Sequence, residues 1–212
     1  MSGDAETMAI GIPVADLGET NAGLVSLYKK DGTDWNMSQQ ITGPAVYWGR
    51  LGFSLDWSHD SSTLAISAIY LSGYIYELPD VTSIYDLFHT TANFYAWEVC
   101  VSSDGSTVGI TSNNGAMIFV RNGNTFQHRG PTLNDYGGYW SDIALNYNGT
   151  IAAIGDSTWS SNRGRMGVFQ WRDENGNGPM VWMQMGSDIT GDATDDHLGY
   201  CIDNIRCIDS SL

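Results

Sequence analysis

One pattern of hydrophobic and polar positions occurs four times along the chain. A polar turn and the short apolar run that follows it occupy 102–110, and the same order of residue types returns at 58–66, at 146–154 and, near the start, at 2–10. The turn residues that anchor the four copies lie 56, 44 and 44 residues apart, namely Asp4, Asp60, Asp104 and Asn148. A period in this range is typical of stacked supersecondary units.

Each copy extends into four short strands. A first strand ends at the polar turn, the apolar run after the turn is the second strand, and a third begins at glycine and alternates apolar with polar positions. Asn-Gly or Asp-Gly pairs, which are typical of tight hairpins, then lead to an outer fourth strand. First strands are expected at 52–57, 97–101, 140–145 and 199–208, third strands at 23–28, 73–78, 115–120 and 167–171, and the clearest outer strands at 35–38 and 182–185.

These repeats predict an all-β fold, a small β-propeller with four blades of four antiparallel strands. The chain starts at the turn before a second strand and stops after a lone first strand. We therefore expect the C-terminal strand to complete the N-terminal blade and close the ring, which hides the edge strands. The single domain, 1–212, would comprise one blade built from 198–208 plus 7–40 and further blades at 50–90, 96–130 and 139–190. The alternative is a fragment of a larger ring or array.

The composition agrees with an all-β protein that has many turns. Glycine (25 residues) and aromatic residues (12%) are plentiful, whereas charged residues make up only 16%. The formal net charge of −15 makes nucleic acid a poor partner, since phosphate binding needs clustered Lys and Arg. No apolar run is long enough to cross a bilayer, so membrane insertion is not expected. A cation, a basic protein surface or a neutral glycan fits this charge better, although a low pI also serves solubility alone.

The repeats also resemble those of a known family. A Gly-aromatic pair opens the first strands at 52–53 and 199–200, and the second strands read Leu-Ala-Ile-Ser-Ala at 64–68 and Ala-Ile-Gly-Ile-Pro at 9–13. With a third strand of the form Gly-x-Val/Ile-x-x-Tyr/Phe, these features resemble the FG-GAP repeat of integrin-α-type propellers and the degenerate repeats of secreted or surface proteins in algae and bacteria. The resemblance implies extracellular adhesion or recognition, although no signal peptide is visible within residues 1–20.

Calcium-binding members of that family carry a run of Asp and Asn ligands between the first and second strands, because a hard cation needs about six to eight oxygens. Here the loop has shrunk to Ser-x-Asp-Gly, and we expect its Asp or Asn to form an Asx turn that bonds the backbone two residues on. Two other acidic loops are candidates for Ca²⁺, although a plain hairpin and a solvated acidic loop are the favoured interpretations. Their candidate ligands are Asp173, Asn175, Asn177, Asp192 and Asp195.

The sequence offers little support for an enzyme. It contains no nucleophile elbow, P-loop or Cys/His pair with metal-ligand spacing, so we expect a non-catalytic protein. Carboxylates from different loops could still assemble a glycoside-active site, which spacing in sequence does not test. Three cysteines do not make a disulfide framework. Cys201 and Cys207 are close enough to pair, but small buried thiols in strands are the favoured interpretation.

The more informative residues are aromatic. In a propeller, the loops that enter the first strands and the loops that join second to third strands lie on one face. In this chain they carry aromatic rings beside amides and carboxylates, a combination that suits sugar faces or protein partners. The predicted ligand-binding residues are Tyr47, Trp48, Phe94, Tyr95, Asp135, Tyr136, Tyr139 and Trp159. Trp57, Trp97 and Trp140 are expected to pack between blades instead, and packing between blades is an equally good alternative for the loop aromatics.

We therefore expect a non-catalytic recognition or adhesion module that is extracellular or lies on a cell or particle surface, and that binds a glycan or a protein through this aromatic face. The loops vary between repeats whereas the strands do not, which favours recognition. The alternative is a structural subunit of a larger surface or extracellular assembly that has no small ligand.

Overall fold

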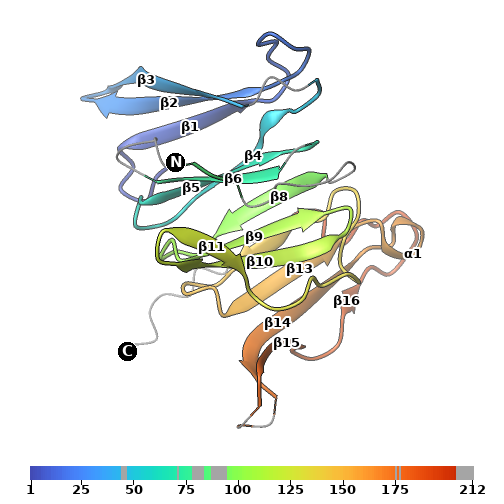
Figure 1. The fold of residues 1–212 in the computed structure, drawn as a ribbon. Coiled ribbons are helices and arrows are strands. Elements are labelled where there is room, and N and C mark those ends of the chain that lie inside the picture. Colours follow the sequence, from blue (N-terminus) through green and yellow to red (C-terminus); the bar gives the residue numbers. More distant parts are fainter. Residues whose placement is uncertain are drawn as a thin grey trace.

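The computed structural model describes residues 1–43, 47–70, 72–77, 84–86, 95–174, 176 and 178–203. These residues form four antiparallel β-sheets that follow one another along the chain and stack in an arc (Figure 1). The described part of the chain includes no helix with the length and hydrophobicity needed to span a membrane. The prediction of an all-β protein with four successive sheets is confirmed.

The strands are grouped as the repeats predict. The first sheet contains β1 (Thr7–Ile12), β2 (Leu24–Asp31) and β3 (Asp34–Thr42). The second contains β4 (Leu51–Trp57), β5 (Thr63–Ala68), β6 (Ser72–Glu77) and β7 (Ile84–Asp86). The third contains β8 (Ala96–Val101), β9 (Thr107–Ser112), β10 (Gly115–Asn122) and β11 (Thr125–His128). The fourth contains β12 (Ile143–Leu145), β13 (Ile151–Asp156), β14 (Arg165–Asp173), β15 (Met180–Gln184) and β16 (Ile189–Thr190), and the short helix α1 (Trp159–Asn162) precedes β14.

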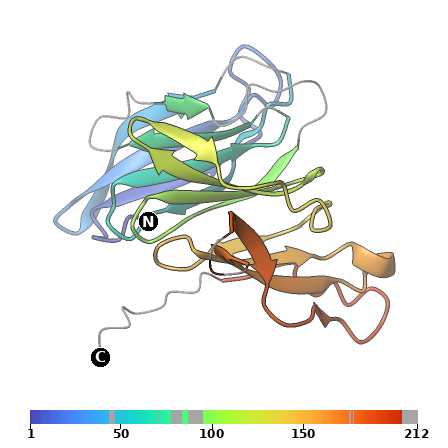
Figure 2. The same cartoon turned by 60° about the horizontal axis from the view of Figure 1, so that its bottom comes forward.

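The innermost strands β1, β4, β8 and β12 lie next to one another in this order. In the second, third and fourth sheets, a first strand pairs with the second strand of the same sheet. Among the described residues the first sheet has no such strand, and the first and fourth sheets lie at opposite ends of the arc (Figures 1 and 2). The predicted closure into a four-bladed ring is therefore not confirmed, and residues 204–208 of the predicted closing strand lie outside the described part.

Apolar side chains fill the spaces between consecutive sheets in three clusters. One isoleucine recurs six residues after the turn anchor, and in the second, third and fourth sheets it is fully buried (Ile66, Ile110 and Ile154, each 0% exposed). Burial of a side chain of this size contributes about 1.5–3 kcal/mol. The spacing between the turn and this isoleucine therefore fixes which residues of each second strand enter the core.

The turn anchors form the predicted Asx turns. In all four copies a side-chain oxygen of the anchor accepts a hydrogen bond from the backbone N–H two residues later, over 2.9–3.3 Å. The same oxygen also accepts a hydrogen bond from a neighbouring hydroxyl in each copy (Ser2, Ser58, Ser102 and Thr150). The prediction made for Asp60, Asp104 and Asn148 is confirmed.

The turns also join neighbouring sheets. The backbone N–H of Asp60 donates to the carbonyl of Ser103 over 3.3 Å, and that of Asp104 donates to the carbonyl of Tyr147 over 3.2 Å. Each turn thus bonds to the equivalent turn of the next sheet, which keeps consecutive sheets in the same relative position.

Asp104 gives the most direct test of the turn. Asp104→Ala removes the acceptor for the Ser102 hydroxyl, the Ser106 N–H and the Ser106 hydroxyl, so we expect the free energy of unfolding to fall by about 1–3 kcal/mol. Asp104→Asn should lose much less, because Asn148 makes the same turn in the fourth sheet. Urea unfolding of both variants measures the difference. Equal losses would show that the turn depends on charge and not on acceptor geometry.

Candidate functional site

Seven aromatic side chains form a continuous row across the first strands. They lie at or near the points where the chain enters β4, β8 and β12, in the turn after β5, and in the segment at 198–203. We call this set the aromatic row: Phe53, Tyr70, Tyr95, Trp97, Tyr139, Trp140 and Tyr200. The row exists because equivalent starts of consecutive first strands are brought side by side.

Trp97 lies at the centre of the row. Its ring centroid is 6.0 Å from that of Phe53, 5.2 Å from that of Tyr139 and 5.9 Å from that of Trp140. Trp140 in turn stacks on Tyr200, with a centroid distance of 5.9 Å and an interplanar angle of 23°. Aromatic pairs at such distances are favourable beyond the area they bury, so the rings support one another.

The rings differ in exposure. Trp97 is 8% exposed and anchors the row, whereas four rings offer surface to solvent: Tyr70 (45%), Tyr139 (59%), Trp140 (49%) and Tyr200 (54%). Exposed aromatic rings with a rigid base give a large contact area at little conformational cost. This part of the row is the candidate binding surface.

The loop that carries Tyr139 and Trp140 is fixed by hydrogen bonds. The Ser157 hydroxyl donates to the carbonyl of Trp140 over 3.0 Å, and the Thr111 hydroxyl donates to the carbonyl of Ser141 over 2.7 Å. Trp140 has a φ of 65°, in the left-handed region that non-glycine residues rarely adopt. A strained residue persists only where its surroundings hold it, so the position of the Trp140 ring is imposed by the fold.

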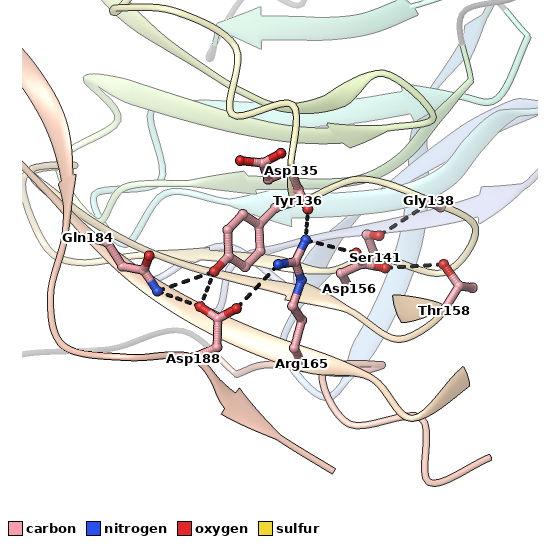
Figure 3. A network of polar contacts seen from close by, with 9 residues as sticks. All are labelled: Asp135, Tyr136, Gly138, Ser141, Asp156, Thr158, Arg165, Gln184 and Asp188. Carbon is pink, nitrogen blue, oxygen red and sulfur yellow. Dashed lines mark hydrogen bonds and ion pairs between the residues drawn. The ribbon is translucent and has the colours of Figure 1, made fainter. Parts of the chain in front are cut away.

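A polar network lies beside this loop (Figure 3). The Arg165 guanidinium, with 14% of its side chain exposed, pairs with the carboxylates of Asp156 over 3.6 Å and Asp188 over 3.3 Å. It also donates to the carbonyl of Asp135 and stacks on the ring of Tyr136, with 4.3 Å between its central carbon and the ring centroid. One cation therefore ties the start of the loop to the fourth sheet.

The Asp188 carboxylate accepts the remaining hydrogen bonds of the network. Tyr136 and Gln184 each donate a hydrogen bond to its carboxylate. Although burial raises the pKa of Asp188, the hydrogen bond from Tyr136 and those from Gln184 and Arg165 outweigh it and hold the pKa below its usual value. Burial and the bond to Asp188 raise the pKa of Tyr136. The network is thus charged on Asp188 and neutral on Tyr136 at ordinary pH, which suits a structural support.

Two carboxyl groups are close in sequence to the aromatic row: Glu98 follows Trp97 in β8, and Asp142 lies just before β12. Burial raises the pKa of Glu98 to about 7, with a hydrogen bond to Ser54 acting against this shift and the nearby Asp142 adding to it. Burial also raises the pKa of Asp142, even though its carboxylate accepts hydrogen bonds from the backbone N–H groups of Ile143 and Ile202. Both groups are therefore protonated more easily than an exposed carboxyl group.

The structure divides the predicted ligand-binding residues into separate places. Tyr95 and Tyr139 belong to the aromatic row, whereas Tyr47 (62% exposed) and Trp48 form a separate pair with Arg50 stacked on the Trp48 ring. The others lie in or beside the Arg165 network: Asp135, Tyr136 and Trp159. Phe94 lies outside the described residues.

Two sequence interpretations need revision. Tyr136 is 5% exposed, because its ring packs against Phe169 and under Arg165, so it has no face left for a ligand. Trp140 is half exposed, which makes the expectation that it packs between blades wrong, while Trp57 and Trp97 are buried as expected (8% each). Phe53 and Tyr200 belong to the row but were not among the predicted ligand-binding residues. The Gly-aromatic pairs that open their first strands were the signal that could have identified them, because the row forms at these positions.

The predicted calcium ligands make ordinary loop contacts. Asp173 accepts hydrogen bonds from the N–H groups of Gly176 and Gly178 within its hairpin, and Asp195 accepts one from the Asn162 amide over 3.0 Å. Asn175 and Asn177 lie outside the described residues. Within the described ranges, no three His, Cys, Asp or Glu side chains lie where they could hold one metal ion. Cys100 is buried, Cys201 is exposed, and the predicted pairing with Cys207 lies outside the described part.

Comparison with known proteins identifies the fold. No protein-family model and no curated protein matches this sequence. The Swd1 β-propeller domain of Myceliophteria thermophila is similar over 80% of this chain and 50% of its own, with a TM-score of 0.57 and 11% identity. Sqt1 of Chaetomium thermophilum, solved bound to the N-terminus of a ribosomal protein, is similar over 78% and 42% (TM-score 0.55, 17% identity). Hydrazine synthase of Kuenenia stuttgartiensis is similar over 80% and 44% (TM-score 0.55, 11% identity).

These similarities support a β-propeller fold and, at such identities, nothing finer. The chain spans half or less of the length of each of these proteins.

Glu98 makes the free energy of unfolding of the protein depend on pH. Because its pKa rises from 4.5 to about 7 on folding, the folded protein binds more protons than the unfolded chain between these values, and stability falls as the pH rises through this window. Glu98→Gln, which stays neutral, should raise the free energy of unfolding at pH 8 by up to about 3 kcal/mol and change it little at pH 4. Thermal unfolding across this range measures the effect. Glu174→Gln in an exposed hairpin is the control, and parallel profiles for both variants would contradict the assignment.

Proposed function

We propose that this chain is a non-catalytic recognition module that acts outside the cell or on a cell or particle surface, and that it binds a glycan through the aromatic row. The observation that carries the proposal is the exposure of Tyr70, Tyr139, Trp140 and Tyr200 on a row whose central member, Trp97, is buried. Polar soluble proteins seldom expose a contiguous set of large rings without a binding role.

The chemistry of the row suits a neutral sugar. Apolar sugar faces stack on aromatic rings, and the phenol hydroxyl groups of the exposed Tyr139 and Tyr200 can exchange hydrogen bonds with the hydroxyl groups at the sugar edge. The net charge of −15 disfavours an anionic ligand at the same surface. The FG-GAP-like repeats of the sequence support a surface or extracellular setting for such a module.

A structural subunit of a larger surface assembly is the second candidate. It is favoured by the first sheet, in which β1 has no neighbour on one side among the described residues. In that case the rings of the aromatic row would be buried against another chain, and a stable contact would need roughly 1,200–2,000 Å² of total buried area. Sqt1, whose structure holds the end of another protein, illustrates protein recognition on a related fold. A closed four-bladed ring would fit either candidate.

A glycan array with the purified chain tests the proposal, and the chain offers a matched pair of variants. Trp140 and Tyr147 are each 49% exposed and lie just before and just after β12. Trp140→Ala should weaken binding of any glycan found by at least about tenfold, because stacking rings commonly dominate such contacts. Tyr147→Ala should leave the affinity unchanged.

The melting temperatures of both variants provide the stability control. Equal loss of binding in the two variants, or binding that survives Trp140→Ala, would contradict the aromatic row as the binding surface. A blank array together with a protein partner that buries the row would favour the structural subunit.

A further inference from the structure

The strand β1 is unlike its counterparts in the other sheets. The isoleucine that follows the turn anchor by six residues is fully buried in β5, β9 and β13, whereas its counterpart Ile10 is 41% exposed and Ile12 is 40% exposed. The sequence of β1 has the same apolar pattern as the other second strands. Each of those counterparts belongs to a core cluster shared with the preceding sheet, which contributes Val25, Ala65 and Cys100 respectively. Among the described residues no sheet precedes the first, so the exposure of Ile10 arises from a missing sheet and not from a surface-adapted sequence.

Among the described residues, β1 also lacks the first strand that pairs with β5, β9 and β13 in the other sheets. The N–H of Lys30 in β2 donates to the carbonyl of Glu6, so the alternation of an antiparallel ladder directs the backbone groups of Ala9 and Gly11 away from β2. At the position of Ala9, the other sheets have a residue that pairs with the first strand (Ala65, Gly109 and Ala153). No strand within the described ranges pairs with this edge of β1, and an uncharged apolar edge of this kind is a template for pairing with another strand.

The opposite end of the arc offers the complementary part. Leu198 forms a parallel bridge with Gly164 in the fourth sheet, and the same bridge joins Leu51, which begins β4, to Gly23 in the first sheet. The segment at 198–203 therefore lies beside the fourth sheet in the position that the first strand of a following blade would take.

A second contact fixes the register of this segment. The N–H of Ile202 donates to the carboxylate of Asp142, just as the N–H of Val99 in the third sheet donates to the hydroxyl of Ser54 in the second. Ile202 is thus equivalent to Val99, which pairs with the buried isoleucine of its own sheet, Ile110.

We propose that a second copy of this chain covers β1. In this arrangement the first strand at 198–203 of one copy pairs with β1 of the other, with Ile202 opposite Ile10. Because this segment lies beside the fourth sheet, the pairing would bring the fourth sheet of one copy against the face of the first sheet that carries Ile10. It would thus extend the continuous stack of sheets from one chain into the next. Because the two surfaces differ, the contact is head to tail.

The curvature of the arc favours a second copy over closure within one chain. The first and fourth sheets lie at opposite ends (Figures 1 and 2), so one chain would have to bend its stack to bring its own ends together. About four-fifths of this chain superposes on half or less of the similar propellers, 50%, 42% and 44% of their lengths. Two such arcs joined head to tail at both ends would close a ring with two-fold symmetry.

Light scattering and variant mixing test the proposal on the full chain. We expect the unmodified protein to have about twice the 23.1 kDa mass of the chain, with association strengthened by salt because two chains of −15 repel each other. Ile10→Asp blocks one surface and Ile202→Asp the other, so each variant alone should be monomeric. An equimolar mixture should regain a dimer, since each partner keeps the surface that the other lacks, although one joint binds more weakly than two.

Met37→Asp is the matched control, because Met37 is 57% exposed on the outer strand of the same sheet and should leave the dimer intact. Hydrogen exchange of the peptide that spans β1 separates the remaining outcomes. Protection that grows with protein concentration supports pairing between copies. A monomer whose β1 is protected at every concentration would overturn the proposal in favour of closure within one chain. A monomer with unprotected β1 would overturn it in favour of a different partner.

Discussion

The fold depends on one side-chain oxygen in each repeat, which belongs to Asp4, Asp60, Asp104 or Asn148. This oxygen closes the turn between a first and a second strand and so decides which residues of the second strand face the core. The backbone N–H of Asp60 and of Asp104 bonds to the turn of the following sheet, so local turn geometry also determines how the sheets stack. A short polar turn with small side chains therefore sets both the entry into the second strand and the stacking on the next sheet, because the side chain and the backbone N–H of one residue make the two contacts.

The aromatic row is a consequence of this stacking. Since each turn holds its sheet in the same place relative to the next, the points at which consecutive first strands begin lie side by side, and the rings at those points meet around Trp97. The Arg165 network then holds the loop with Tyr139 and Trp140 against the fourth sheet. Binding surfaces on rigid elements need less ordering when a ligand arrives, and the aromatic row has a base of strands and a loop held by the Arg165 guanidinium, whose side chain is only 14% exposed.

The sequence was sufficient to predict the four sheets, their strand order and the Asx turns, because the spacing of the anchors and the hairpin signals are local. It was not sufficient to predict the exposure of Trp140. This residue has a left-handed backbone conformation, which the residue types around it do not indicate. Tyr136 was assigned to the surface because it lies in a loop, and only the tertiary contact with Arg165 shows that it is buried. The curvature of the arc likewise depends on small angles between sheets, which a repeat length does not encode.

The central claim is that the aromatic row binds a neutral glycan. The most direct measurement follows the indole N–H signals of the eight tryptophans in ¹H–¹⁵N spectra while neutral oligosaccharides (β-glucan, mannan and chito-oligosaccharide fragments) are added one at a time. The account predicts that the signals of Trp140 and Trp97 shift together in a saturable manner, whereas those of Trp171 and Trp182, which pack against each other in the fourth sheet, stay in place. Saturable shifts confined to other tryptophans would place the ligand elsewhere and contradict the claim.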